Sequence, residues 1–318
     1  MLTDFLQLSE WGVTTILALS PLIGMVLALV WPSKDDNIVR WGVFAWSLVP
    51  LGITLYLWFS GGFNAGLLSA DGKQAMIQQV DRVQWIPFLN AQYFVGLDGM
   101  NFPLIFLTTV LTPLCILAAF RIQTRQRVYL ALMLLLESAM LGYFVSLNFL
   151  LMFLFWEFSL VPMFFIINNW GGDNRRYAAF KFFVYTMAGS VGMLIIFEFI
   201  YLATGTFDLA VLARLAQGLP VDPTLLAPKF GAVAYQPGMK LGEMIYYAAQ
   251  DSGLTSLLGN STGTYSAIIF WCIFVAFAVK LAVWPLHTWQ PDTYENAPTS
   301  GSMIVSAVMS KMGAYGMI

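Results

Sequence analysis

The chain has 318 residues, of which 59% are hydrophobic, 16% aromatic and only 10% charged. This composition lies far outside that of a soluble domain and is typical of an integral membrane protein. The formal net charge of −2 argues against nucleic-acid binding as the main activity. The two cysteines, Cys115 and Cys272, both lie in apolar runs, so we interpret them as small hydrophobic side chains.

A transmembrane helix needs about 20 predominantly apolar residues, and eight segments of the chain meet this requirement. The first four are predicted at residues 13–31, 41–60, 98–120 and 128–147. No Lys or Arg precedes the first segment, so it lacks the basic start of a cleavable signal peptide and we expect it to be retained. The polar stretch from Gly61 to Asn90 predicts a loop outside the bilayer, with some extended structure.

The fifth and sixth spans are predicted at residues 149–170 and 177–203. Only Asn148 separates the fourth span from the fifth. So short a connection predicts that these two spans form an antiparallel pair in contact.

Residues 204–262 form the longest break in hydrophobicity, and we interpret them as a long external loop. Within it, the segment FDLAVLARLAQ has helical spacing and is suited to lying along the membrane interface. The seventh span runs from Tyr265 to Val283, where Trp284-Pro285 interrupts it. Because apolar residues continue to Trp289, we predict a broken helix.

The eighth span is predicted from Ala297 to Ile318, where the chain ends without polar flanking residues. We therefore expect the chain to be the N-terminal part of a longer protein. The short loops that carry basic residues are predicted to be cytoplasmic, which places the N-terminus outside the cell. These basic residues are Lys34, Arg40, Arg121, Arg125, Arg127, Arg175 and Arg176.

Four ionisable residues lie deep in predicted spans: Glu137, Glu157, Lys280 and Lys311. A charged side chain at the bilayer centre costs at least about 2.5 kcal/mol, so such residues usually face a protein interior and mark an ion or proton path. Glu137 and Glu157 are near the middle of adjacent spans, and two close carboxylates would need a cation between them. Lys280 and Lys311 are the candidates for that cation.

Lys280 lies beside the predicted helix break, where exposed backbone groups require protein or water around them. Burial makes a Lys ammonium easier to deprotonate, whereas Arg stays charged. His287, the only histidine, follows seven residues later and titrates in the useful range. The pattern predicts a proton switch in which Glu157 controls the charge of Lys280.

Simpler interpretations remain open for several of these residues. Lys311 and Lys181 are each placed so that they can extend to the membrane interface, and Glu137 can serve only to hydrogen-bond a neighbouring helix. His287 lies near two tryptophans and can be a packed interfacial residue. In the eighth span a stripe of small residues predicts a close-packing face beside Lys311, formed by Ser302, Ser306, Ser310 and Ala314.

Three long motifs resemble subunit M, or chain 4, of the proton-translocating NADH:quinone oxidoreductases (respiratory complex I). They are VGLDGMNFPLIFLTT, which contains Asp98; FWEFSLVPMFFIINNWGG followed by RRYAAFKFFVYT; and FAVKLAVWPLHTWQPDTYENAPTSGS. By this resemblance, Glu157, Lys280, His287 and Lys311 would form the proton path. Glu137, Lys181 and Asp98 are further candidate site residues.

The resemblance implies an all-α polytopic membrane bundle in which residues 1–96 provide two spans and an external loop. Residues 97–318 would form the first of two antiporter-like repeats. NADH, flavin, iron–sulfur clusters and quinone would be bound by partner subunits, and the chain would contact the lipid bilayer and neighbouring antiporter-like subunits in a bacterial inner membrane. One departure is QPDTYENAPT, where Tyr294 replaces a second histidine of the family pattern, and the loop at 204–262 is longer than expected.

Two other functions share parts of this pattern. A multisubunit cation/proton antiporter or membrane-bound hydrogenase subunit would have the same helical plan. A structural membrane scaffold would use its buried charges only to pair helices.

Overall fold

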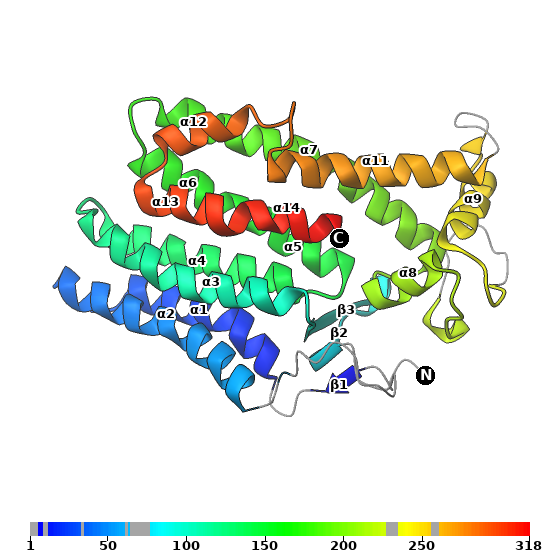
Figure 1. The fold of residues 1–318 in the computed structure, drawn as a ribbon, viewed down its shortest axis with the longest axis horizontal. Coiled ribbons are helices and arrows are strands. Elements are labelled where there is room, and N and C mark those ends of the chain that lie inside the picture. The colour runs from blue at the N-terminus through cyan, green and yellow to red at the C-terminus, as the bar shows by residue number, and fades with distance from the viewer. Residues whose placement is uncertain are drawn as a thin grey trace.

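In the computed structural model the chain is a bundle of long helices that run side by side (Figure 1). The described residues are 6–8, 12–32, 35–60, 63, 77–226, 235–255 and 261–318. Seven spans in these residues are long and apolar enough to cross a membrane. They are α1 (Val13–Val30), α2 (Asp36–Phe59), α3 (Asn101–Ala118), α4 (Gln126–Val145), α5 (Phe149–Phe158) with α6 (Leu160–Trp170), α7 (Arg175–Thr204) and α11 (Thr262–Leu281). The predicted helical membrane bundle is therefore confirmed.

Local sequence explains where several of these helices begin and end. The side chain of Asp35 accepts a hydrogen bond from the backbone N–H of Asn37 at the start of α2, and that of Asn148 accepts from Leu150 and Leu151 at the start of α5. Helix α7 stops at Gly205, whose φ of 74° favours glycine.

The eighth predicted span consists of three consecutive helical pieces. They are α13 (Thr299–Ile304), a π-helical turn η5 (Val305–Met309) and α14 (Ser310–Met317). A π turn shifts the register of the side chains that follow it, which a prediction from regular helical spacing does not include.

The predicted break in the seventh span lies slightly earlier than its proline. Helix α11 ends at Leu281, and Ala282 has a left-handed backbone with φ of 60°. After a non-helical segment the chain resumes as α12 (Trp289–Asn296). Figure 1 shows α12 beyond the end of α11 and next to α7.

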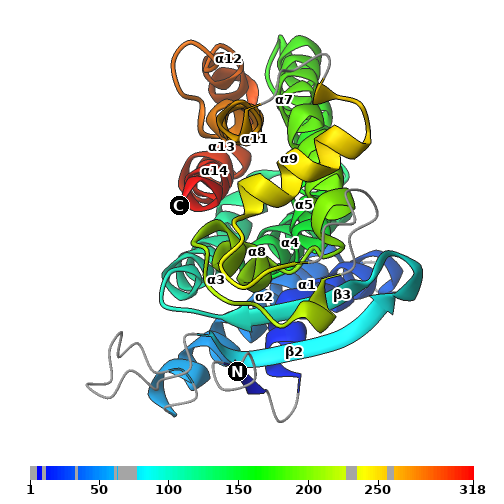
Figure 2. The same ribbon diagram turned by 90° about the vertical axis from the view of Figure 1, so that its right-hand side faces the viewer.

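A small sheet is added to this helical plan. Strand β2 (Ile77–Ile86) pairs antiparallel with β3 (Ala91–Leu97), and β1 (Leu6–Leu8) pairs parallel with β2. The turn between β2 and β3 contains the 3-10 turn η2 (Pro87–Leu89) and Asn90, which has φ of 49°. The extended structure expected before Asn90 is thus a hairpin (Figure 2).

The connection between α4 and α5 is hydrogen-bonded to this hairpin and to the chain that follows α7. The backbone N–H of Leu147 donates to the carbonyl of Phe94 at 2.9 Å, and that of Phe149 donates to Phe207 at 2.8 Å. Leu209 returns a bond to Leu147 at 3.0 Å. Helices α4 and α5 are therefore held as the predicted antiparallel pair, with the start of α5 fixed from both sides.

The described parts of the 204–262 linker contain two helices. Helix α8 (Leu209–Ala216) covers the segment predicted from its spacing, and α9 (Leu241–Asp251) packs against α7 and α11. The 3-10 turn η4 (Pro223–Leu225) lies between them along the chain. Buried residues of α9, such as Ile245 and Ala248, share a hydrophobic cluster with Ile200 of α7.

The two ends of the bundle differ in character. The hairpin end carries β2, β3, α8 and α9, whereas the α3–α4 and α6–α7 connections lie at the opposite end (Figure 1). We call this the arginine end, because Arg121, Arg125, Arg127, Arg175 and Arg176 lie in or next to these connections. Lys34, predicted to belong to the same group, lies outside the described residues. Among these seven spans α4 is the most enclosed, because 83% of the residues in its 18-residue apolar stretch are buried.

Candidate functional site

Lys280 is the penultimate residue of α11 and is 2% exposed. Its Nζ donates to the hydroxyl of Ser159 at 2.8 Å and to the backbone carbonyl of Trp156 at 3.2 Å. The ammonium also lies 4.2 Å from the centre of the Trp156 ring, a position that favours a cation. The buried charge is therefore solvated by one short stretch of the chain.

Glu157 lies within that same stretch, between the two residues that bind Lys280. It is half-buried, and its carboxylate accepts a hydrogen bond from the hydroxyl of Ser190 on α7. No ion pair within 4 Å joins Glu157 to Lys280 among the described residues, but the two charges interact electrostatically. The acid and the amine thus lie in one region of the structure, and the direct contacts to Lys280 are made by Trp156 and Ser159.

This geometry suits a switch more than a fixed ion pair. The Lys280 ammonium has three N–H donors, and its hydrogen bonds go to uncharged groups. A small movement of the Glu157 side chain alone would change the electrostatic field at Lys280 without breaking these bonds. The arrangement allows the charge of one group to respond to the position of the other.

His287 lies in the non-helical segment between α11 and α12. Its Nδ1 is buried without a hydrogen-bond partner among the described residues, and its carbonyl accepts from the backbone N–H of Gln290 at 2.9 Å. The hydrogen bonds of Lys280 do not include His287. An unpaired buried ring nitrogen is a place where water would be accommodated.

Lys311 is exposed on α14, and its hydrogen bonds do not go to Glu157 or Lys280. Its Nζ donates to the backbone carbonyl of Ser306 at 2.7 Å and to the hydroxyl of Ser310 at 3.3 Å. The Ser306 carbonyl belongs to the π-helical turn η5. The Lys311 ammonium is therefore hydrogen-bonded to the turn that directly precedes α14.

The close-packing face of α14 also differs from the predicted stripe of small residues. Ser306 in that stripe is exposed. A Cβ at Gly313 would lie 2.8 Å from backbone atoms of Phe277 and Leu281, so Gly313 provides the close approach to α11. The prediction failed here because the π turn rotates the C-terminal half of the span.

Glu137 is fully buried on α4, and neither carboxylate oxygen has a hydrogen-bond partner among the described residues. It lies near Cys115 of α3. No hydrogen bond or ion pair in the described chain links it to Glu157, Lys280 or Lys311. The structure therefore does not place the two predicted carboxylates in one shared site.

Lys181, near the start of α7, has an ion-pair partner on α12. Its Nζ lies 2.5 Å from Oδ2 of Asp292 in α12, and 5.5 Å from the centre of the Tyr177 ring. This ion pair joins two residues that are 111 positions apart. No local pattern in the sequence indicates it.

Asp98 has a structural position at the start of α3. Its Oδ1 accepts from the backbone N–H of Met100 at 2.7 Å and of Asn101 at 2.6 Å. The Asn101 side chain in turn accepts from the backbone N–H of Asp98 at 2.9 Å. Burial raises the pKa of Asp98 above its ordinary value, while the two backbone donors oppose that shift.

Sequence reasoning did not find the partners of the central pair. Ser159 and Trp156 flank Glu157, so a search of its immediate neighbours for hydroxyl groups and aromatic rings would have found them. Ser190 lies on another helix and gives no local signal.

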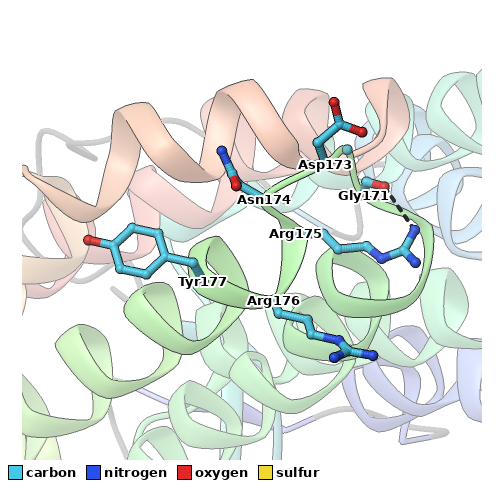
Figure 3. A pocket seen from close by; sticks show the side chains of 7 residues that line it. Gly171, Asp173, Asn174, Arg175, Arg176 and Tyr177 are labelled. Atoms are coloured by element: carbon cyan, nitrogen blue, oxygen red, sulfur yellow. Dashed lines mark hydrogen bonds between the residues drawn. The ribbon is translucent and has the colours of Figure 1, made fainter.

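A separate pocket of about 550 Å³ lies in the loop at the arginine end. It is lined by residues 171–177, and Figure 3 shows the guanidinium groups of Arg175 and Arg176 below Asp173. Arg175 donates to the carbonyl of Gly171 at 3.4 Å. None of the predicted site residues lines this pocket.

Comparison with known proteins supports the resemblance found in the motifs. Residues 146–318 match the family described as NADH:quinone oxidoreductase/Mrp antiporter, TM. Residues 76–142 match the family described as NADH-ubiquinone oxidoreductase chain 4, amino terminus.

Two curated relatives show the extent of the likeness. The NADH-quinone oxidoreductase subunit M of Rhodobacter capsulatus is 34% identical over 302 residues, which cover 95% of this chain and 51% of the relative. The F(420)H(2) dehydrogenase subunit M of Methanosarcina mazei is 34% identical over 308 residues, which cover 96% of this chain and 52% of the relative. The chain therefore spans about half the length of these relatives.

The fold is also found in a solved structure, that of respiratory complex I from Thermus thermophilus with bound NADH. The superposition has a TM-score of 0.64 at 20% sequence identity and covers 95% of this chain and 50% of the other. At that identity the likeness shows the fold alone. The first family description accounts for more than half of the residues, and the chain belongs to the NADH:quinone oxidoreductase/Mrp antiporter transmembrane family.

Proposed function

We propose that the chain is a proton-translocating membrane subunit of an NADH:quinone oxidoreductase. The observation that carries this proposal is the buried Lys280 ammonium, held at a helix break by the two residues that flank the half-buried Glu157. A buried ionisable group with a nearby counter-charge is a feature of proton relays in membranes. The match of residues 76–142 to chain 4 favours this reading within the family.

In the proposed mechanism Glu157 sets the protonation of Lys280. While the carboxylate is close, the Lys280 ammonium is stabilised, and a shift of the carboxylate favours release of the proton. The proton then passes through His287 and water toward Lys311. Glu137, Lys181 and Asp98 remain further candidates, and Glu137 is the one whose carboxylate has no partner among the described residues.

Redox chemistry is assigned to partner subunits. NADH, flavin, iron–sulfur clusters and quinone would be bound there, and coupling would reach this chain through neighbouring membrane subunits. We further propose that residues 97–318 form the first antiporter-like repeat, that the N-terminus is external and that the membrane is a bacterial inner membrane. The positively charged loops at one end of the bundle support this orientation.

A second candidate is a subunit of a cation/proton antiporter, which the family description also includes. The two functions separate in proteoliposomes that contain the purified complex. An oxidoreductase acidifies or alkalinises the lumen when NADH and quinone are added, whereas an antiporter responds to a sodium gradient without either substrate.

Substitution of Lys280 tests the proton-transfer role itself. Lys280→Arg keeps a positive charge but cannot release a proton near neutral pH, so we expect NADH-driven proton transport to be lost in Lys280→Arg as well as in Lys280→Met. If Lys280→Arg transports protons normally, the charge only pairs helices. In that case the double variant Glu157→Gln with Lys280→Met would also retain activity, as a structural scaffold requires.

A further inference from the structure

Helix α12 depends on its neighbours for its position. It has only eight residues, and isolated helices of that length are unstable in water. Its buried side chains are Trp289, Thr293 and Asn296.

The C-terminal half is fixed to the loop between α6 and α7. The carbonyl of Asn296 accepts from the backbone N–H of Gly172 at 2.8 Å, and its side-chain oxygen accepts from that of Asn174 at 3.0 Å. Both bonds lie at the C-terminal end of α12, so they do not by themselves hold its first turn.

The N-terminal half is fixed by one face of α7. Lys181 forms the 2.5 Å ion pair with Asp292, and one helical turn later the Tyr185 hydroxyl accepts from Thr288 at 2.8 Å. Phe182 packs against Trp289 with ring centres 5.4 Å apart. Lys181 and Tyr185 are four residues apart and so lie on the same side of α7.

The first residue of α12, Trp289, is hydrogen-bonded to the end of α11. The indole N–H of Trp289 donates to the carbonyl of Val279 at 2.8 Å, and this bond is buried. Val279 directly precedes Lys280 and packs against α7, where a Cβ at Gly189 would lie 3.0 Å from it. Any shift of Trp289 therefore acts on the backbone next to Lys280.

We propose that Lys181 and Asp292 are positioning residues whose ion pair holds α12 against α7, fixing through Trp289 the helix end that presents Lys280 to Ser159 and Trp156. Neither residue touches Lys280. The role of the pair in transport rests on the function proposed above, whereas its effect on α12 does not.

Hydrogen exchange of the purified complex tests the effect on α12 directly. We compare the backbone amides of residues 289–296, apart from Pro291, which has no N–H, in Lys181→Met, in Asp292→Asn and in Glu198→Gln. Glu198 is an exposed carboxylate near the other end of α7 and serves as the control. We expect exchange in this segment to rise roughly tenfold in the first two variants and to stay at the wild-type rate in the control.

Asp292→Asn preserves side-chain shape and provides the test if Lys181→Met fails to assemble. Wild-type exchange of residues 289–296 in the assembled variant overturns the proposal. It does so whether or not the proposed function holds.

Proton transport per electron tests the link to Lys280. Lys181→Met and Asp292→Asn are expected to lose most of the transport, while Lys181→Arg and the charge-reversed pair Lys181→Asp with Asp292→Lys regain it. Rescue by arginine separates positioning from proton transfer, because Lys280→Arg is expected to fail. Faster exchange with normal transport in Lys181→Met would overturn the positioning role, whereas normal transport in Glu157→Gln would instead overturn the proposed function.

Discussion

The ammonium of Lys280 donates its shortest hydrogen bond, 2.8 Å, to the hydroxyl of Ser159. That hydroxyl donates in turn to the carbonyl of Trp156 at 2.7 Å, so its lone pairs are directed toward the ammonium. Both acceptors of Lys280 thus come from the stretch that carries Glu157. A movement of this stretch would change the hydrogen bonds and the electrostatic field at Lys280 together.

Ser159→Ala is predicted to reduce coupled turnover by about tenfold or more. Loss of a hydrogen bond to a charged group costs about 1.5–3 kcal/mol, which is roughly a 10- to 100-fold change in an equilibrium constant. NADH-driven proton transport in proteoliposomes measures the effect. Ser146→Ala is the control, because it removes a hydroxyl that donates to the carbonyl of Gly142 in the last turns of α4. Equal transport by both variants would refute the prediction.

Gly313→Ala is predicted to lower the thermal stability of the purified protein. The added Cβ would meet backbone atoms of Leu281 and Phe277 at 2.8 Å, and backbone cannot move aside as a flexible side chain does. Overpacking of this kind costs about 1–3 kcal/mol. Gly52→Ala, where nothing lies within 4 Å, is the matched control. A melting temperature for Gly313→Ala as high as that of Gly52→Ala would contradict this packing.

The ion pair between Arg82 and Asp208 at the hairpin end predicts a pH dependence of stability. Burial raises the pKa of Asp208 above its ordinary value of 3.8, and Arg82, at 3.1 Å, opposes the shift. The pKa of Asp208 is therefore higher in the folded chain than in the unfolded chain. Its contribution to the free energy of unfolding is fully present below pH 3.8 and is lost as the pH rises through the folded-state pKa.

Measured against Asp208→Asn, the wild type should therefore lose stability as the pH rises above 3.8. The slope for one proton is at most about 1.4 kcal/mol per pH unit. Asparagine preserves the cap of α8, since it is as good a cap residue as aspartate. A wild type that instead gains stability with pH would mean that the attraction to Arg82 exceeds the effect of burial.

Much of the fold followed from the sequence because membrane spans are long apolar runs with local signals at their ends. The short connection at Asn148, the helix in the 204–262 linker and the broken helix near Trp284 were all predicted. The end of α11 was placed two residues too late, because the left-handed residue Ala282 gives no sign in the sequence.

The candidate site was harder to predict because depth in the membrane does not fix the direction of a side chain. Glu137 and Glu157 looked equivalent by depth, yet Glu137 lies near Cys115 and Glu157 lies near Lys280. The pair of Lys181 and Asp292 brings distant helices together, and spacing along the chain carries no information about it.

Whether Glu157 controls proton release from Lys280 is best measured as the number of protons translocated per electron in the assembled complex with Glu157→Gln. Glutamine keeps the size of the side chain and its ability to bond Ser190, but it removes the charge that acts on Lys280. Glu198→Gln serves as the control for loss of one carboxylate. We expect proton transport by Glu157→Gln to fall to background while the complex still assembles. Wild-type stoichiometry in that variant would show that the charge of Glu157 does not control Lys280.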